Sequence, residues 1–341
     1  MLFNQIRIPQ NMKLSNNSLK VFVLTLFIYL YGCDMHQSNS KGRAIGAPGE
    51  LLLVMDNDLQ NSEVKSLLVD FARDEFPCIP QPEPTFKMTT ITPTAFEGHF
   101  KAYRNIIIVN QNKSGENDIQ YQKDVWASHQ QVLKVTIDEV HAFASLFSNN
   151  RNKIFDFLYY GDIKSMQKAN LNGADAATKD FIKSRYGINM VLPRGYRLVK
   201  DTLNFSWFRF DKLETIQSVV LHSFDMPDVE SLNCTDLVAL RDSVCKTYIP
   251  GPYAKSYMVT EKALPVLIKT LKINNTEVIE IRGLWKVNGY FMGGPFVDYF
   301  IKDEKQNKLI MIEGFVYAPK KQNKAYYVRQ IESILHSMDY L

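Results

Sequence analysis

A short apolar run near the start of the chain separates a leader from the part that must fold. The run covers residues 21–31, follows Lys20 and leads into Leu-Tyr-Gly-Cys at positions 30–33. A helix of eleven residues rises roughly 16 Å, about half of a ~30 Å hydrocarbon core, so the run suits a signal segment better than a permanent membrane span. An aliphatic residue three positions before a cysteine, and a small residue directly before it, form the pattern of a lipoprotein signal.

This pattern predicts that residues 1–33 comprise a signal peptide and a lipidated cysteine. The thiol of Cys33 would carry a diacylglyceryl group, and two or more acyl chains of the palmitate type hold a protein stably on a membrane. The alternative is an ordinary cysteine beside an apolar helix, which the polar sequence that follows disfavours. Residues 34–47 are polar and are expected to form a flexible tether. Met12-Lys13 would open an ordinary leader, so we expect translation to begin at Met12 and not at Met1.

The net charge of the part that follows the leader limits the classes of partner. The formal net charge is +4, but residues 1–32 contribute three basic residues and no acid, so +1 remains after removal of the leader. The basic balance therefore gives no support for a nucleic-acid partner.

After removal of the leader and apart from Cys33, three cysteines remain, at 78, 234 and 245. The last two lie on one predicted helix, three turns and roughly 16 Å apart, which is too far for a disulfide.

Hydrophobic periodicity predicts an α+β fold in which antiparallel sheets are flanked by helices. The chain is expected to have two halves, an N-terminal α/β half at 48–165 and a C-terminal α+β half with an antiparallel meander at 185–341. The second half resembles the α-β-α sandwich of photosystem extrinsic proteins. Helices are expected at 64–71, 140–160, 234–247 and 327–338, and strands at 50–55, 86–91, 105–109, 133–137, 196–200, 205–210, 216–222, 256–260, 278–287, 296–302 and 308–317.

One acidic pair gives a weak indication of metal chemistry. Asp56 and Asp58 directly follow a predicted apolar strand, as in aspartate-nucleophile phosphatases, and two acids there could bind Mg²⁺. However, Gln60 stands where that pattern needs a hydroxyl residue. The sequence contains no H-E-x-x-H, no P-loop, no dinucleotide fingerprint and no histidine pair at i, i+4 spacing. No cofactor is therefore expected, and Asp56 and Asp58 are more readily explained as a turn at a helix entry.

The most unusual stretch is 282–296, where four glycines and a proline interrupt strands rich in aromatic residues. One explanation is structural, with the glycines shaping bulges and the aromatic residues filling a core beneath them. The other is a recognition surface, because arginine and aromatic residues are the usual anchors of binding surfaces, and this stretch and two similar ones are therefore candidates for partner binding. If strand pairing is regular, Arg282 and Trp285 point to opposite faces, with Trp285 in the core and Arg282 outside. A bulge at Gly283 would instead bring both to one side. The candidate partner-binding residues are Arg282, Trp285, Trp207, Arg209 and Tyr257.

Several stretches together resemble an uncharacterised lipoprotein family of the Bacteroidetes, classed as a domain of unknown function. Besides the signal pattern and Glu50–Met55 with Asp56, they are Pro80-Gln-Pro-Glu-Pro-Thr-Phe86, Arg104-Asn-Ile-Ile107, Pro193-Arg-Gly-Tyr196, Trp207-Phe-Arg209, Gly251-Pro252 with Ser256-Tyr-Met258, Arg282-Gly-Leu-Trp285 and Phe291-Met-Gly-Gly-Pro-Phe296. The resemblance implies a cell-envelope lipoprotein and transfers no catalytic residue. Surface-exported lipoproteins of that phylum often carry an acidic cluster after the lipidated cysteine. Here only Asp34 stands at that place, which favours a periplasm-facing anchor, and the expected location is the outer membrane.

These observations favour a lipid-anchored envelope protein with a non-enzymatic binding or scaffolding role. It would contact the membrane through Cys33 and bind a partner protein of the envelope. The alternative is a metal-assisted hydrolase that uses Asp56 and Asp58. In that case both acids should face a cleft that holds further acids or histidines.

The lipid anchor can be tested directly by metabolic labelling with a fatty-acid analogue. The wild-type chain should be labelled, and Cys33→Ala should not, because the acylated thiol is removed. Cys78→Ala is the matched control and should be labelled like the wild type. Equal labelling of wild type and Cys33→Ala would contradict the prediction.

Overall fold

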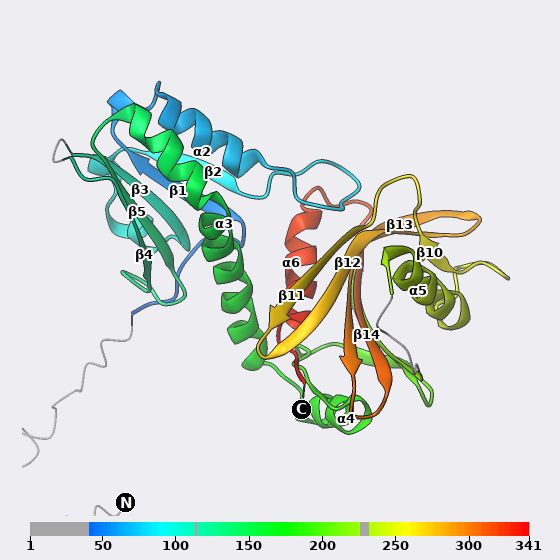
Figure 1. Ribbon diagram of the computed structural model, residues 1–341. Helices are drawn as coiled ribbons and strands as arrows, with labels where there is room; N and C mark the ends of the chain where they lie inside the picture. The colour runs from blue at the N-terminus through cyan, green and yellow to red at the C-terminus, as the bar shows by residue number, and fades with distance from the viewer. Residues whose placement is uncertain (1–40, 113–114, 226–231, 341) are drawn as a thin grey trace, which may run out of the picture. The chain divides into compact units, whose positions relative to one another are not determined.

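The computed structural model describes residues 41–112, 115–225 and 232–340 (Figure 1). The predicted signal peptide, Cys33 and residues 34–40 lie outside the described residues. Residues 41–47, predicted to belong to the tether, are instead attached to the first sheet. Arg43 and Ile45 form parallel bridges with Ser128 and Tyr103. The tether prediction is therefore wrong for these residues, because their backbone groups find partners in two loops of the first sheet.

The first sheet has the strand order β2-β1-β3-β5-β4. Its first four strands are parallel and only β4 is antiparallel, so the expectation of antiparallel sheets is wrong here. The reason is connectivity, since α2 (Glu63–Arg73) supplies the long crossover that the parallel step from β1 to β2 needs. The strands are β1 (Glu50–Met55), β2 (Lys87–Ile91), β3 (Asn105–Gln111), β4 (Asp118–Lys123) and β5 (Gln131–Ile137).

The second sheet is antiparallel, as expected, with the order β10-β12-β13-β14-β9-β8-β7. An additional strand, β11, pairs with β12 on the same edge as β10, and the sequence did not predict it. The strands are β7 (Arg197–Asp201), β8 (Phe205–Lys212), β9 (Thr215–Asp225), β10 (Met258–Thr260), β11 (Leu267–Ile273), β12 (Thr276–Val287), β13 (Tyr290–Asp303) and β14 (Lys308–Tyr317).

Helices cover both faces of the second sheet, which confirms the α+β class and gives this half three layers (Figure 1). The helix α5 (Cys234–Tyr248) packs on one face and α6 (Lys324–Leu335) on the other. Gly314 of β14 permits this close approach of α6, since an added Cβ would lie 1.9 Å from Ile331 Cγ2. The predicted helix between Cys234 and Cys245 is confirmed as continuous.

The long helix α3 (Val140–Leu171) links the two sheets. It packs on β5 and α2 of the first sheet and also against α6 of the second. A shorter helix, α4 (Ala176–Tyr186), follows it, and the strands β6 (Ile188–Asn189) and β15 (Asp339–Tyr340) pair with each other. Among the described residues, no helix is both long and apolar enough to cross a membrane.

Strand pairing is regular between Arg282 and Trp285, so these residues point to opposite faces of β12. The only register shift in this pair of strands lies between Lys286 and Val287, and a bulge at Gly283 is therefore excluded. Trp285 lies in the core beneath α5, where its indole Nε1 donates to the carbonyl of Val316 at 3.2 Å.

Replacing Trp285 by alanine should destabilise the fold by about 3–5 kcal/mol, because a buried aromatic side chain and its hydrogen bond are lost. Chemical denaturation of the purified variant measures this change. Phe291→Ala in the adjoining hairpin is the control. Its side chain is fully exposed, and the substitution should change stability by less than about 0.5 kcal/mol. Equal stability of Trp285→Ala and wild type would contradict the assignment of this face to the core.

Candidate functional site

A buried ion-pair network connects β12, α6 and α3. Arg282 of β12 donates through Nε and Nη2 to the two carboxylate oxygens of Glu280, at 2.9 and 3.0 Å. Its Nη2 also donates to Glu332 of α6 at 2.6 Å. The hydroxyl of Tyr159 in α3 donates to the second oxygen of Glu332. All four side chains are buried, and the network joins three elements that are distant in sequence, with Glu332 linking Arg282 of β12 to Tyr159 of α3.

The network sets the protonation states of Arg282, Glu280 and Tyr159. Burial alone would raise the pKa of Glu280, but Arg282 and Lys269 outweigh burial and hold the pKa below its ordinary value. Burial would likewise lower the pKa of Arg282, but Glu332 and Glu280 hold it well above its ordinary value. Burial, together with Glu332, raises the pKa of Tyr159 well above 10. Arg282 and Glu280 are therefore charged at neutral pH, and Tyr159 keeps its proton to donate.

The segment before β2 positions α6 for this network. Alternating prolines at 80–84 keep that segment extended and place Glu83 at the start of α6. The Glu83 carboxylate accepts from the backbone N–H groups of Lys324 and Ala325 at 2.7 and 3.1 Å, where the helix dipole favours negative charge. Farther along α6, Arg329 donates to the carbonyl of Thr85 at 2.6 Å. The helix that carries Glu332 is thus fixed to one loop by hydrogen bonds at Glu83 and Thr85.

A cavity of about 300 Å³ opens above the network, between the edge strand β11 and helix α3. Lys269 of β11 lies at its side and pairs with Glu280 at 3.2 Å. Leu267 and Ile268 of β11 also line the cavity, and each is 46% exposed. The charged side chains at the bottom of the cavity form ion pairs with one another. Aromatic or aliphatic side chains form most of the walls. The lining residues are Pro77, Thr85, Phe155, Tyr159, Tyr160, Leu267, Ile268, Lys269, Glu280, Arg282 and Glu332.

The five predicted partner-binding residues do not form one surface. Arg282 lines the cavity, but it is buried and paired, so its predicted position outside the core is wrong. The reason is compensation by two carboxylates, one of which comes from a helix fifty residues later in the chain. Trp285 lies in the core on the opposite face. Arg209 pairs with Asp211 at 2.8 Å.

The remaining two predicted residues also lie away from the cavity. Trp207 packs against the core beneath α5, and the guanidinium group of Arg209 lies 6.0 Å from the centroid of its ring. Tyr257 is half-buried, and Lys246 of α5 lies 5.4 Å from its ring centroid. Neither side chain lines the cavity beside β11, so any role in binding would involve another surface.

Asp56 and Asp58 are exposed at the entry to a short 3-10 helix. Neither lines the cavity described above. Within the described residues, no group of three or more histidine, cysteine, aspartate or glutamate side chains is arranged to hold a metal ion. The hydrolase alternative needed both acids to face a cleft with further acids or histidines, and the described part of the chain does not bring such residues to them.

A second buried polar cluster lies under α5. Arg241 donates to Glu313 of β14 at 2.7 Å and to Thr260 at 2.9 Å, and its guanidinium lies 3.8 Å from the ring centroid of Phe296. Asp298 of β13 lies opposite Glu313 in the register of the two strands, and its side chain is fully buried. Burial, with Glu313 beside it, raises the pKa of Asp298 well above its ordinary value. This cluster is enclosed by the core and does not line the cavity beside β11.

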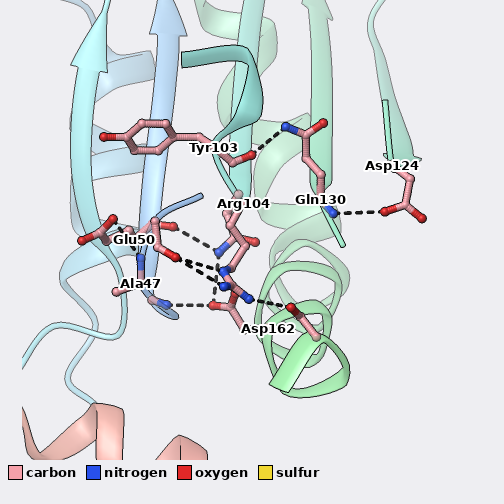
Figure 2. Close-up of polar contacts among 11 residues, drawn as sticks. Ala47, Glu50, Tyr103, Arg104, Asp124, Gln130 and Asp162 are labelled. Atoms are coloured by element: carbon pink, nitrogen blue, oxygen red, sulfur yellow. Dashed lines mark hydrogen bonds and ion pairs between the residues drawn. The ribbon is translucent and has the colours of Figure 1, made fainter. Parts of the chain in front are cut away.

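A third cluster fastens α3 to the first sheet (Figure 2). Arg104, directly before β3, lies 3.6 Å from Asp162 of α3 and donates to Ser165 at 2.7 Å. Asp162 also accepts from the backbone N–H of Gly49 at 2.8 Å and from Asn105 at 3.1 Å. Burial raises the pKa of Asp162, although Arg104 and the Gly49 N–H oppose the shift. This cluster holds α3 in the position from which Tyr159 reaches Glu332.

Replacing Arg282 by methionine should destabilise the protein by about 3–5 kcal/mol at pH 7, because buried Glu332 loses its ion-pair partner and buried Glu280 keeps only the half-exposed Lys269. Without Arg282, burial would raise the pKa of Glu280, so the folded variant would take up a proton. The loss should therefore shrink as the pH falls towards 4, because the Glu280 carboxyl of the variant becomes neutral. Denaturation curves of variant and wild type between pH 4 and 8 measure the difference.

Arg209→Met is the matched control, because Arg209 and Asp211 form a partly exposed pair worth at most about 1 kcal/mol. A loss for Arg282→Met that is equally small and independent of pH would contradict the buried network.

Two family models match consecutive parts of the chain. One, a domain of unknown function called DUF8532, matches residues 44–170, and a second, DUF4837, matches residues 175–337. No curated protein matches.

Solved structures show only distant likeness. The Ran-binding protein Mog1p of Saccharomyces cerevisiae is 8% identical, with a TM-score of 0.30 over 45% of this chain and 90% of that one. A Mog1 mutant gives 8% identity and a TM-score of 0.28 over the same shares of the two chains. Human StAR-related lipid transfer protein 5 is 10% identical, with a TM-score of 0.21 over 51% of this chain and 93% of that one. At such scores we assign nothing from these proteins. The chain therefore combines segments similar to two domain families whose functions are unknown.

Proposed function

We propose that this chain is a lipid-anchored protein of the cell envelope that acts by binding a partner protein. The lipoprotein signal pattern at residues 30–33 supports the anchor, with Cys33 as the lipidated residue. Only Asp34 follows Cys33 directly, and the lack of an acidic cluster there favours a folded part that faces the periplasm. We propose the outer membrane as the location of the anchor. The matched domain families carry no assigned activity, so the proposed binding role depends on the cavity beside β11.

The observation that carries the binding role is the combination of a cavity and an edge strand. Among the strands of the described residues, β11 pairs only with β12, so the backbone along its other edge is available. Extended polypeptides bind such edges by adding a strand, while pockets beside the edge select their side chains. Leu267 and Lys269 lie opposite Arg282 and Glu280 in the ladder, and all four line the cavity. A strand added to β11 would therefore direct alternate side chains towards it.

The electrostatics of the cavity favour a neutral side chain from the partner. Arg282 is neutralised by Glu280 and Glu332, and Lys269 also pairs with Glu280. A charged side chain would have to be desolvated without an unpaired counter-charge to meet it. Phe155 and Tyr160 of α3 instead offer aromatic surface on the wall that faces β11. We therefore expect the partner to present an extended segment with an apolar or aromatic residue.

This role can be tested by pull-down from the membranes of the native organism with the tagged, full-length chain. Leu267→Lys combined with Ile268→Lys should reduce the yield of the partner at least tenfold, because two charges would line the binding edge. Both side chains are about half exposed, so the thermal midpoint should change little.

The control is Leu213→Lys in the β8–β9 hairpin, which adds a charge at a fully exposed position and should retain the partner. If the double variant folds and captures every partner of the wild type, the proposed binding site is wrong.

A further inference from the structure

A second cavity, of about 260 Å³, is lined by three arginines and by no acidic side chain. Arg43 comes from the segment before β1, Arg104 from the position directly before β3, and Arg194 from the turn before β7. Two of the stretches singled out in the sequence, those beginning at Arg104 and at Pro193, thus meet at one cavity. This cavity shares no lining residue with the one beside β11.

The turn that carries Arg194 has a backbone shape that depends on Gly195. This glycine has φ +102°, a conformation that side chains rarely permit, and an added Cβ would lie 2.7 Å from the ring of Phe210. Tyr196 stacks on the same ring, with centroids 5.5 Å apart. Both rings line the cavity, so the turn is packed on aromatic surface and holds the backbone of Arg194 beside the opening.

The positive charge at this cavity is only partly compensated. Arg104 has a buried partner in Asp162, but neither Arg43 nor Arg194 forms a salt bridge with another described residue within 4.0 Å. Asp175, the N-cap residue of α4, interacts electrostatically with Arg194 but does not line the cavity. Two guanidinium groups, each with five hydrogen-bond donors, are therefore left with no carboxylate in the wall.

Neutral hydrogen-bonding groups complete the wall. The Tyr196 hydroxyl donates to Gln217 at 2.9 Å, Gln217 donates to Gln330 at 2.6 Å, and Gln330 donates to the Tyr326 oxygen at 3.1 Å. Burial raises the pKa of Tyr196 well above 10, so this chain of bonds keeps its direction at neutral pH. The Tyr326 oxygen accepts the last bond, which leaves its own hydrogen for an acceptor in the cavity.

We propose that this cavity binds a phosphate group. Two guanidinium groups with no carboxylate in the cavity wall match the charge of roughly −1.5 to −2 that a phosphate monoester carries at pH 7, and a single carboxylate would neutralise only one of them. Guanidinium groups also bind phosphate oxygens in pairs of parallel hydrogen bonds. The Tyr326 hydroxyl supplies a neutral donor, and the rings of Tyr196 and Phe210 offer apolar surface to whatever the phosphate is attached to.

Such a phosphate could belong to a soluble ester or to a lipid headgroup, and two titrations distinguish them. The first adds phenyl phosphate to the full-length chain and follows binding by calorimetry. The second measures co-sedimentation with phosphatidylcholine vesicles that contain or lack phosphatidic acid, so that any lipid anchor contributes equally to both. Binding of phenyl phosphate assigns a soluble ester, and binding that depends on phosphatidic acid alone assigns a headgroup. Binding in neither titration would overturn the proposal.

Variants test whether the binding takes place at this cavity. Arg194→Gln and Arg43→Gln should each weaken binding at least tenfold without a change in the thermal midpoint, since both side chains are exposed. Arg197→Gln removes a neighbouring exposed arginine that pairs with Asp211, and it controls for net charge. Equal weakening by all three variants would mean non-specific attraction and would overturn the proposal. Unchanged binding in Arg194→Gln and Arg43→Gln would overturn it as well.

Discussion

The ion pair between Arg282 and Glu332 is the interaction on which the arrangement of the structure most depends. It joins β12 of the second sheet to α6, and through the Tyr159 hydroxyl it reaches α3, which packs on the first sheet. A charged group this deeply buried is favourable only when its partners are held in place. Glu83 at the start of α6 and Asp162 on α3 provide that support, each by accepting backbone or amide hydrogen bonds.

The fold could be predicted from sequence wherever one face of an element is buried. The alternation of Ile281, Trp285 and Val287 predicted the face of β12 that packs under α5, and the helix from Cys234 to Cys245 was predicted with nearly its observed ends. The two-residue strands β6 and β15 were missed, and the missed strands of the two larger sheets, β4 and β11, are both edge strands. Most of their side chains are exposed or half-exposed, so they carry little of the hydrophobic periodicity from which strands are inferred.

The candidate sites were harder to predict, because their residues meet only in the folded chain. Arginine is rarely buried, so the sequence placed Arg282 outside the core. Its burial depends on Glu332, a residue on a different element, and no local pattern signals that pairing. Likewise, no local pattern signals that Arg43, Arg104 and Arg194 line one cavity, because they come from three separate segments. Two of those segments were distinctive in sequence, but their shared cavity was not foreseen.

A double-mutant cycle between Arg282 and Glu332 tests the central claim most directly. The free energy of unfolding is measured for wild type, Arg282→Met, Glu332→Gln and the double variant at pH 7. If the pair holds β12 to α6 as described, the double variant should be more stable than the sum of the single losses predicts, by roughly 2 kcal/mol. Losses that add within about 0.5 kcal/mol would show that the two residues act independently, and the account would be wrong.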